Sequence, residues 1–159
     1  MSAEWTVART IPSSRDVVWD WLQIPENIFS LNILHARVDC AEKRMAKGTT
    51  ANVLHRMGFK TELRVLTVKA WEPYRLSWSD LYEDGADFFP HAQQLKLTET
   101  DVGHCQVENR LSGRFVVPRW LQWSLPLYDV VGPQILQAEL RKLGRWVVGG
   151  GCEVKAKRS

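Results

Sequence analysis

Six polar residues occupy strand-like positions that alternate with large apolar residues. Successive side chains of a strand point to opposite faces, so residues two apart share a face. In the stretch from Arg75 to Tyr82, Leu76 and Trp78 therefore point the same way as two polar residues. The polar residues predicted to share an apolar face in this manner are Asp80, Tyr82, His91, Gln93, Asn109 and Arg9. We expect them to lie at one end of a space with apolar walls.

Three of these residues are of types that hold or move protons. An imidazole titrates near neutral pH and burial can raise a carboxyl toward neutrality, so His91 and Asp80 are candidates for general acid and base catalysis. The Tyr82 hydroxyl could donate a hydrogen bond to a developing enolate oxygen. All three lie near predicted strand ends, where polar residues also serve simply to solvate the rim of a site. The sequence leaves both roles open.

Other catalytic and cofactor-binding patterns are missing from the sequence. His35, His55, His91 and His104 have no i, i+4 pair and no neighbouring carboxylate in a metal-binding register. There is no G-x-S-x-G motif, and the glycine run at 149–151 follows a predicted helix rather than a strand. We therefore predict neither a metal nor a cofactor.

Length and composition predict one globular domain. The chain has 159 residues, of which 45% are hydrophobic and 25% charged, and this suits a single core. We expect the domain to span residues 1–148 and residues 149–159 to form a flexible tail. The formal charge of +3 is mild and lies partly in that tail, so a nucleic-acid partner is not expected. The eight tryptophans could fill a core or line an apolar cavity.

Cysteine spacing and hydropathy indicate the compartment. The three cysteines are far apart and form no C-x-x-C pair, which favours a reduced, cytoplasmic protein. The first ten residues lack the basic and apolar segments of an export signal, and no stretch of about 18 apolar residues occurs. We therefore expect neither export nor stable membrane insertion. The sequence does not predict the oligomeric state.

Hydrophobic periodicity predicts a strand, two short helices and then a run of strands. A first helix over residues 15–23 has an apolar stripe, and Pro25 starts a second helix that reaches about Leu31. The period then changes to two. The predicted strands are 5–11, 34–40, 49–57, 59–71, 75–82, 88–98 and 104–115. Short links between successive strands imply an antiparallel meander.

Helical periodicity returns after Val117. A long helix is predicted by an apolar stripe made of Leu136, Leu140, Leu143 and Val147. Proline removes a helical hydrogen bond and clashes with the preceding turn. Pro126 and Pro133 therefore predict a short helix at 119–124, a distorted stretch, and a long helix that starts only at Pro133.

The segment VVPRWLQWSLPLYDVVGP before the long helix is strongly apolar. It includes Trp120, Trp123 and Tyr128, and its two prolines argue against one regular helix. Three roles are open for it: packing beneath the long helix, a lid over a site, or transient contact with a membrane or a lipid-bearing partner.

The order of these elements resembles that of the SRPBCC superfamily, which includes START domains, Bet v 1-like proteins and polyketide cyclases. The local markers are Ile11-Pro12-Ser13-Ser14, Val17-Val18-Trp19 with Pro25-Glu26, Lys47-Gly48-Thr49, the hairpin from Val68 to Leu76, and Glu139-Leu140-Arg141-Lys142-Leu143. The resemblance implies an α+β helix-grip fold, in which a curved antiparallel sheet of about seven strands wraps around a long C-terminal helix. It implies two short helices after the first strand and a deep apolar cavity between sheet and helix.

The resemblance and the predicted inward faces together favour a ligand-binding cavity. The residues expected to contact the ligand are Arg9, Ile28, Phe29, Leu31, Trp78, Phe89, Gln93, Leu95, Asn109, Leu111, Trp120, Tyr128, Leu136 and Leu140. The leading hypothesis is a carrier or binding protein for a hydrophobic small molecule such as an aromatic, polyketide or isoprenoid compound. The alternative is a cyclase, aromatase or dehydratase in which His91, Asp80 and Tyr82 move protons. A third class is a protein-interaction module of the chaperone-activator kind.

Overall fold

The structure is a computed structural model that describes residues 2–57, 60–80, 89–117 and 119–149. Its elements follow the predicted order, with bounds that shift by a few residues. They are β1 (Ser2–Ile11), α1 (Arg15–Leu22), α2 (Pro25–Phe29), β2 (His35–Asp39), β3 (Thr50–Met57), β4 (Lys60–Glu72), β5 (Arg75–Ser79), β6 (His91–Asp101), β7 (His104–Arg114), the 3-10 helix η1 (Arg119–Ser124) and α3 (Leu125–Val148). Ser14 caps α1, because its Oγ accepts a hydrogen bond from the Val17 amide.

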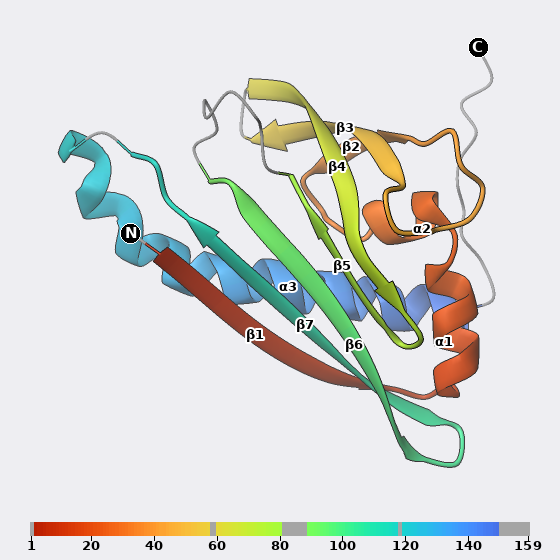
Figure 1. Ribbon diagram of the computed structural model, residues 1–159. Helices are drawn as coiled ribbons and strands as arrows, with labels where there is room; N and C mark the ends of the chain where they lie inside the picture. The colour runs from red at the N-terminus through yellow and green to blue at the C-terminus, as the bar shows by residue number, and fades with distance from the viewer. Residues whose placement is uncertain (1, 58–59, 81–88, 118, 150–159) are drawn as a thin grey trace.

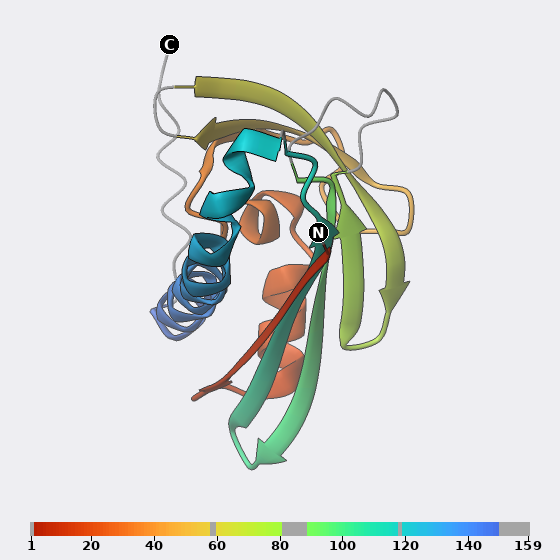
Figure 2. The ribbon, with the colours of Figure 1, turned by 90° about the vertical axis from the view of Figure 1, so that its left-hand side faces the viewer.

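The strands form one antiparallel sheet in the order β1-β7-β6-β5-β4-β3-β2 (Figure 1). The pairing of β1 with β7 is unbroken, whereas register shifts occur between β2 and β3, between β4 and β5 and between β6 and β7. Such irregularities bend a strand and increase its twist. Figure 2 shows the resulting curved sheet with all three helices on its concave side. This is the predicted α+β helix-grip arrangement.

The core lies between α3 and the concave face of the sheet. The predicted stripe of α3 is confirmed, since Leu136, Leu140 and Leu143 are at most 1% exposed. On the sheet side, Ile11 and Val107 are fully buried. Full burial of one such side chain contributes about 1.5–3 kcal/mol, so this contact is a main source of stability.

The prediction that α3 starts only at Pro133 is wrong. The helix begins at Leu125 and continues through both prolines. Pro126 lies in the first turn, where the amide has no helical partner in any case. Pro133 removes one hydrogen bond from the interior, and burial of Leu125 and Leu136 on either side of it holds the helix together.

The two tryptophans of α1 pack against different parts of the chain. Trp19 stacks on Trp71 of β4 with ring centroids 4.6 Å apart, and Trp21 lies 5.8 Å from Trp146 of α3. Val17, which shares the predicted apolar stripe, is instead 51% exposed. The helix α1 is therefore fixed between the β4–β5 hairpin and the end of α3 by aromatic contacts (Figure 1).

Two glycines of α3 offer a matched test of how closely this helix packs against β1. A Cβ at Gly132 would lie 2.5 Å from the Trp5 ring, whereas a Cβ at Gly144 would find its nearest neighbour, Ile11, at 3.9 Å. We predict that Gly144→Ala stabilises the protein by roughly 0.5–1 kcal/mol, because alanine is the better helix former. Gly132→Ala should lower the melting temperature, because the indole must move. Circular dichroism melts measure both, and equal stabilisation by both variants would contradict the close contact.

Candidate functional site

A cavity of about 280 Å³ lies between the concave face of the sheet and the first half of α3. Most of the side chains around it are apolar. It is lined by Trp5, Asn32, Leu34, His55, Arg64, Phe89, His91, Leu111, Phe115, Tyr128, Val131, Gly132, Ile135 and Leu136. A volume near 300 Å³ with apolar walls and few polar groups is typical of a small-molecule site.

One side of the cavity is an aromatic wall. Phe89 stacks on Phe115 with ring centroids 4.3 Å apart, and it stacks on His91 with centroids 5.2 Å apart. Tyr128 of α3 lies 4.8 Å from Phe115, and Trp5 of β1 lies 5.7 Å from Phe89. Aromatic rings prefer offset-stacked or edge contacts with other rings, so this wall favours a flat aromatic ligand.

A second side is a polar wall that belongs to β3, β4 and β6. Its centre is a buried ion pair, in which Arg64 Nη1 lies 2.6 Å from Asp80 Oδ2 and the two side chains are 4% and 2% exposed. Asp80 Oδ1 also accepts a hydrogen bond from the His91 amide at 3.2 Å. Glu62 lies 3.4 Å from Arg64 Nη2. The guanidinium that faces the cavity is thus fixed from behind by carboxylates.

The position of the proton on His91 follows from its partners. Nδ1 lies 3.0 Å from Asp80 Oδ1 and 2.9 Å from the Phe89 carbonyl oxygen, and both of these atoms are acceptors. Nδ1 must therefore carry a hydrogen, which leaves Nε2 as the nitrogen able to accept a proton or a hydrogen bond. An imidazole oriented by a carboxylate in this way is suited to general base catalysis.

The neighbouring histidines are neutral. Burial, with a smaller effect of the Arg64 charge, lowers the pKa of His55 to about 4, and burial lowers the pKa of His35 to about 3. His55 is 6% exposed, and within the described part of the chain its Nδ1 has no hydrogen-bond partner. His55 therefore offers the cavity an uncharged polar nitrogen.

A smaller chamber of about 10 Å³ lies deeper, beside the middle of α3. It is lined by Ile28, Phe29, Leu31, Asn32, His35, Trp78, Gln93, Leu95 and Glu139. Glu139 Oε2 accepts hydrogen bonds from Gln93 Nε2 at 2.6 Å and Asn109 Nδ2 at 2.8 Å. Burial raises the pKa of Glu139 to about 7, although these two hydrogen bonds act to lower it.

The structure brings most of the predicted site residues to one of these two spaces. The large cavity includes Phe89, His91, Leu111, Tyr128 and Leu136. The chamber includes Ile28, Phe29, Leu31, Trp78, Gln93 and Leu95. Asp80 lies behind the polar wall, and Asn109 belongs to the Glu139 network. That any of these residues contacts a ligand remains a prediction.

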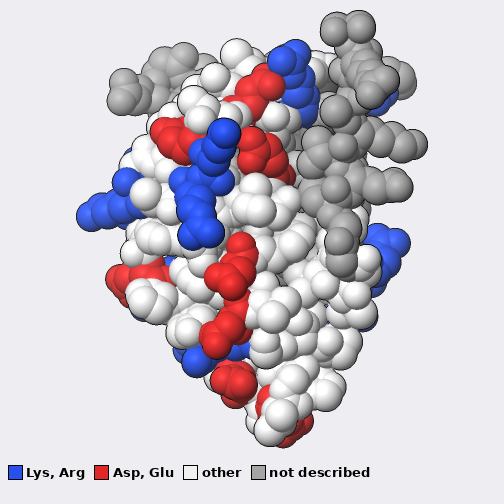
Figure 3. All heavy atoms as spheres, turned by 90° about the vertical axis from the view of Figure 1, so that its right-hand side faces the viewer, with Lys and Arg blue, Asp and Glu red and all other residues white. Residues whose placement is uncertain are grey.

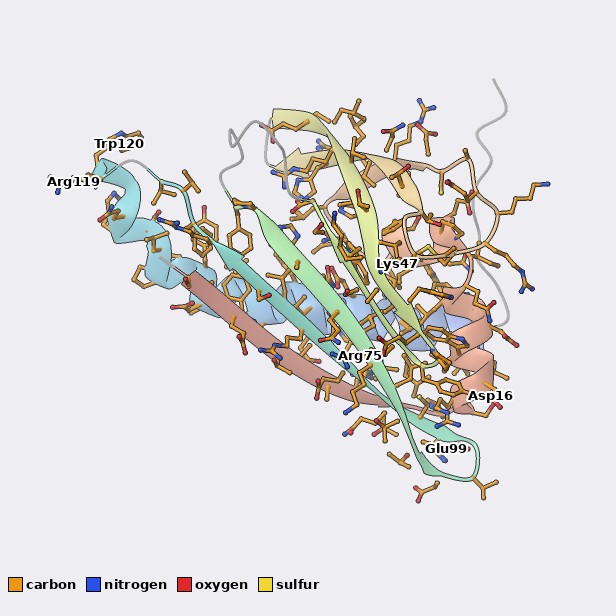
Figure 4. All side chains as sticks on the ribbon, in the orientation of Figure 1. Asp16, Lys47, Arg75, Glu99, Arg119 and Trp120 are labelled. Atoms are coloured by element: carbon orange, nitrogen blue, oxygen red, sulfur yellow. The ribbon has the colours of Figure 1, made fainter. Side chains whose placement is uncertain are left out.

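Three residues that were predicted to contact the ligand line neither the large cavity nor the chamber. Arg9 alternates with Val7 and Ile11 on β1, which are buried, but Arg9 itself is exposed. Leu140 is fully buried in the core, where α3 meets the sheet. Trp120 is 74% exposed and projects from η1, far from the core (Figure 4). Tyr82 lies outside the described residues.

Sequence reasoning missed three polar residues of the site. Arg64 shares its face with Leu66 and Val68, so the rule that placed Asp80 inside applies equally to it. Glu139 lies within the leucine stripe of the long helix, three residues after Leu136. For His55, alternation alone allows either face of its strand, and its exposure of 6% shows that it lies inside.

Two other hollows, of about 340 and 350 Å³, are lined by fewer residues than the cavity: one lies on β4 to β7 and the other beside Phe115 and Leu125. Figure 3 shows acidic and basic side chains interspersed on one face of the molecule. Among the described residues, no three His, Cys, Asp or Glu side chains are placed to hold a metal ion. Within the same residues, no helix is both long enough and apolar enough to cross a bilayer.

Comparisons with known proteins add evidence on the fold. No protein-family model and no curated protein matches the chain. A START superfamily protein from Mycobacterium smegmatis is similar with a TM-score of 0.72 at 10% identity, over 93% of this chain and 99% of that one. Zhui aromatase/cyclase from Streptomyces sp. R1128 is similar with a TM-score of 0.70 at 13% identity, over 96% of this chain and 100% of that one.

A third solved structure is norcoclaurine synthase from Thalictrum flavum in complex with dopamine and hydroxybenzaldehyde. It has a TM-score of 0.67 at 11% identity, over 96% of this chain and 90% of that one. At such low identity the likeness concerns the path of the backbone and not the chemistry of the site. The sheet, the gripped helix and these likenesses together show that the chain has the SRPBCC-type helix-grip fold.

Proposed function

We propose that this protein binds and carries a small aromatic molecule that bears one polar group. The observation that carries the proposal is the cavity in which an aromatic wall meets a polar wall. Core tryptophans such as Trp19 and Trp71 pack on each other away from that cavity, so they do not fill it. A protein-interaction module would not need this internal space, and the third hypothesis is correspondingly weaker.

The two walls determine how such a ligand would lie. Its rings would pack against Phe89 and Phe115, and its polar group would point toward His55, Arg64 and His91. Arg64 can only donate hydrogen bonds, whereas a neutral imidazole offers one donor and one acceptor. A phenol hydroxyl satisfies both kinds of partner, because it accepts from Arg64 and donates to an imidazole nitrogen, whereas a carbonyl oxygen satisfies only the donors and a simple acyl chain satisfies neither.

The size of the cavity limits the ligand. Sites for drug-sized molecules commonly enclose about 300–1,000 Å³, so 280 Å³ is just below that range. One or two fused rings fit this limit better than a sterol does. The complex of norcoclaurine synthase with dopamine and hydroxybenzaldehyde, single-ring compounds, is an example in which a similar fold binds molecules of this size.

A filling substitution tests the proposal. Leu111 is 7% exposed and lines the cavity, whereas Val65 of β4 is 47% exposed. We predict that Leu111→Trp weakens the binding of 2-naphthol at least tenfold, because the new indole occupies the ligand's volume. Val65→Trp should bind like the wild type. Titration calorimetry and native mass spectrometry measure binding. Equal affinity in both variants would refute the proposal. It would also be refuted if the wild type bound no compound in a panel of one- and two-ring phenols and ketones.

The second candidate is an enzyme that cyclises or dehydrates a bound polyketide-like compound. The observation that favours it is the Asp80–His91 contact of 3.0 Å at the cavity wall, because a base oriented in this way removes protons. The aromatase/cyclase with a similar fold makes the class reasonable. Incubation with a linear poly-β-ketone thioester, followed by mass spectrometry, separates the two functions. Cyclised product that His91→Gln fails to make supports the enzyme, and recovery of unchanged substrate supports the carrier.

The buried ion pair gives a prediction about stability. Breaking such a pair by removing one partner costs about 3–5 kcal/mol. In Asp80→Asn the buried Arg64 would lose its 2.6 Å ion pair, although Glu62 would stay 3.4 Å from it. We predict a loss of this size in Asp80→Asn, measured by urea unfolding. The control is Asp39→Asn, since Asp39 pairs with Arg37 at 2.9 Å with both side chains more than half exposed, and such pairs contribute less than about 1 kcal/mol. Similar small losses in both variants would show that Arg64 does not depend on Asp80.

A further inference from the structure

Glu139 lines the chamber beside α3 and does not line the main cavity. Glu139 is 2% exposed, and within the described chain its Oε1 has no hydrogen-bond partner. The other oxygen, Oε2, already accepts two hydrogen bonds from Gln93 and Asn109. A buried oxygen without a partner is costly, so a group that bonds to Oε1 would be stabilised there.

The opposite wall of the chamber supplies a complementary atom. His35 Nδ1 lies 2.5 Å from the Phe29 carbonyl oxygen, which can only accept, so Nδ1 carries the hydrogen. Nε2 of this neutral imidazole is left as an acceptor, and His35 lines the chamber together with Glu139. The two residues thus border one small space from β2 and from α3.

The volume fixes the size of the group that fits. About 10 Å³ is close to the smallest space that holds one water molecule, and a buried water needs two or more polar partners. Glu139 Oε1 and His35 Nε2 are two such partners. Because the remaining walls are mainly apolar, a charged ion would be poorly solvated there.

We propose that this chamber is a second binding site, which holds one hydroxyl oxygen between Glu139 and His35. A neutral Glu139 donates from Oε1 to that oxygen, and the hydroxyl hydrogen is donated to His35 Nε2. If Glu139 is ionised, a water molecule still satisfies both residues, because it has two hydrogens to donate. The oxygen belongs either to water or to the hydroxyl of a ligand, since Asn32 lines both the chamber and the main cavity. The site does not depend on the function proposed for the main cavity.

The charge state of Glu139 can be followed through stability. The charged and titratable groups around it are Lys142 on α3 and His35 on β2, while β6 and β7 face it with amides. Burial raises the pKa of Glu139 from an ordinary 4.5 to about 7, so between these values the folded chain holds a proton that the unfolded chain releases. The stability due to this proton is therefore complete below pH 4.5 and decreases as the pH rises toward 7.

A variant without a titrating group isolates this effect. Between pH 4.5 and pH 8 the wild type should lose about 150-fold in its folding equilibrium constant relative to Glu139→Gln, because the unfolded carboxyl is already half ionised at pH 4.5. His35 and His55 titrate in both proteins and cancel in the comparison. Glu108→Gln, at an exposed position of β7, should show no such pH dependence. A constant ratio between the wild type and Glu139→Gln would contradict a buried acid that is neutral at low pH.

High-resolution crystal structures of the wild type, without additive and soaked with 2-naphthol, test the site directly. We expect one oxygen within hydrogen-bond distance of Glu139 Oε1 and His35 Nε2 in both. The same water in both crystals supports a water site. Its replacement by the naphthol hydroxyl supports a ligand subsite and would mean that the polar group of the ligand lies in the chamber instead of beside Arg64. A chamber without such an oxygen in either crystal overturns the proposal. Naphthol missing from the main cavity, with the oxygen present in the chamber, would count against the proposed function alone.

Discussion

The contact between α3 and the concave face of the sheet determines where every functional group of this chain can lie. The second half of the helix packs closely on the sheet, since Leu140 and Leu143 are fully buried there. The first half is separated from the sheet by the cavity, which Gly132 and Ile135 line. One helix therefore builds a packed core at one end of the sheet and a binding space at the other. The boundary between the two is near Leu136, which belongs to both.

Polar groups inside this contact are stabilised in two different ways. Arg64 is held by a carboxylate at 2.6 Å, so charge balances charge at the cavity wall. Glu139 is surrounded by amides, so it is stabilised by hydrogen bonds and by holding a proton instead. The Glu139 carboxyl changes its charge near neutrality, since burial raises its pKa to about 7.

Periodicity predicted the elements of the fold because burial repeats every two residues in strands and about every 3.6 in helices. It failed at Pro133, where tertiary packing outweighed the loss of one hydrogen bond. Alternation grouped Arg9 with the buried Val7 and Ile11, but Arg9 is exposed, because burial also depends on which elements pack over each position of a face. The meeting of Arg64 with Asp80 and His91 could not be predicted, because it depends on strand register and sheet curvature. The volume left beside α3 depends on how side chains from distant elements pack together.

The pairing of β1 with β7 also has a consequence for how the chain is made. Trp5 lies opposite Leu111, 106 positions later, and the ten pairs that join the two strands are 94 to 112 positions apart. On the ribosome β1 emerges first and has no partner until nearly the whole domain has been synthesised. Contacts this distant in sequence slow folding, because a large loop must close before they form. During synthesis β1 therefore stays unpaired until β7 has been made, and its apolar face is exposed in the meantime.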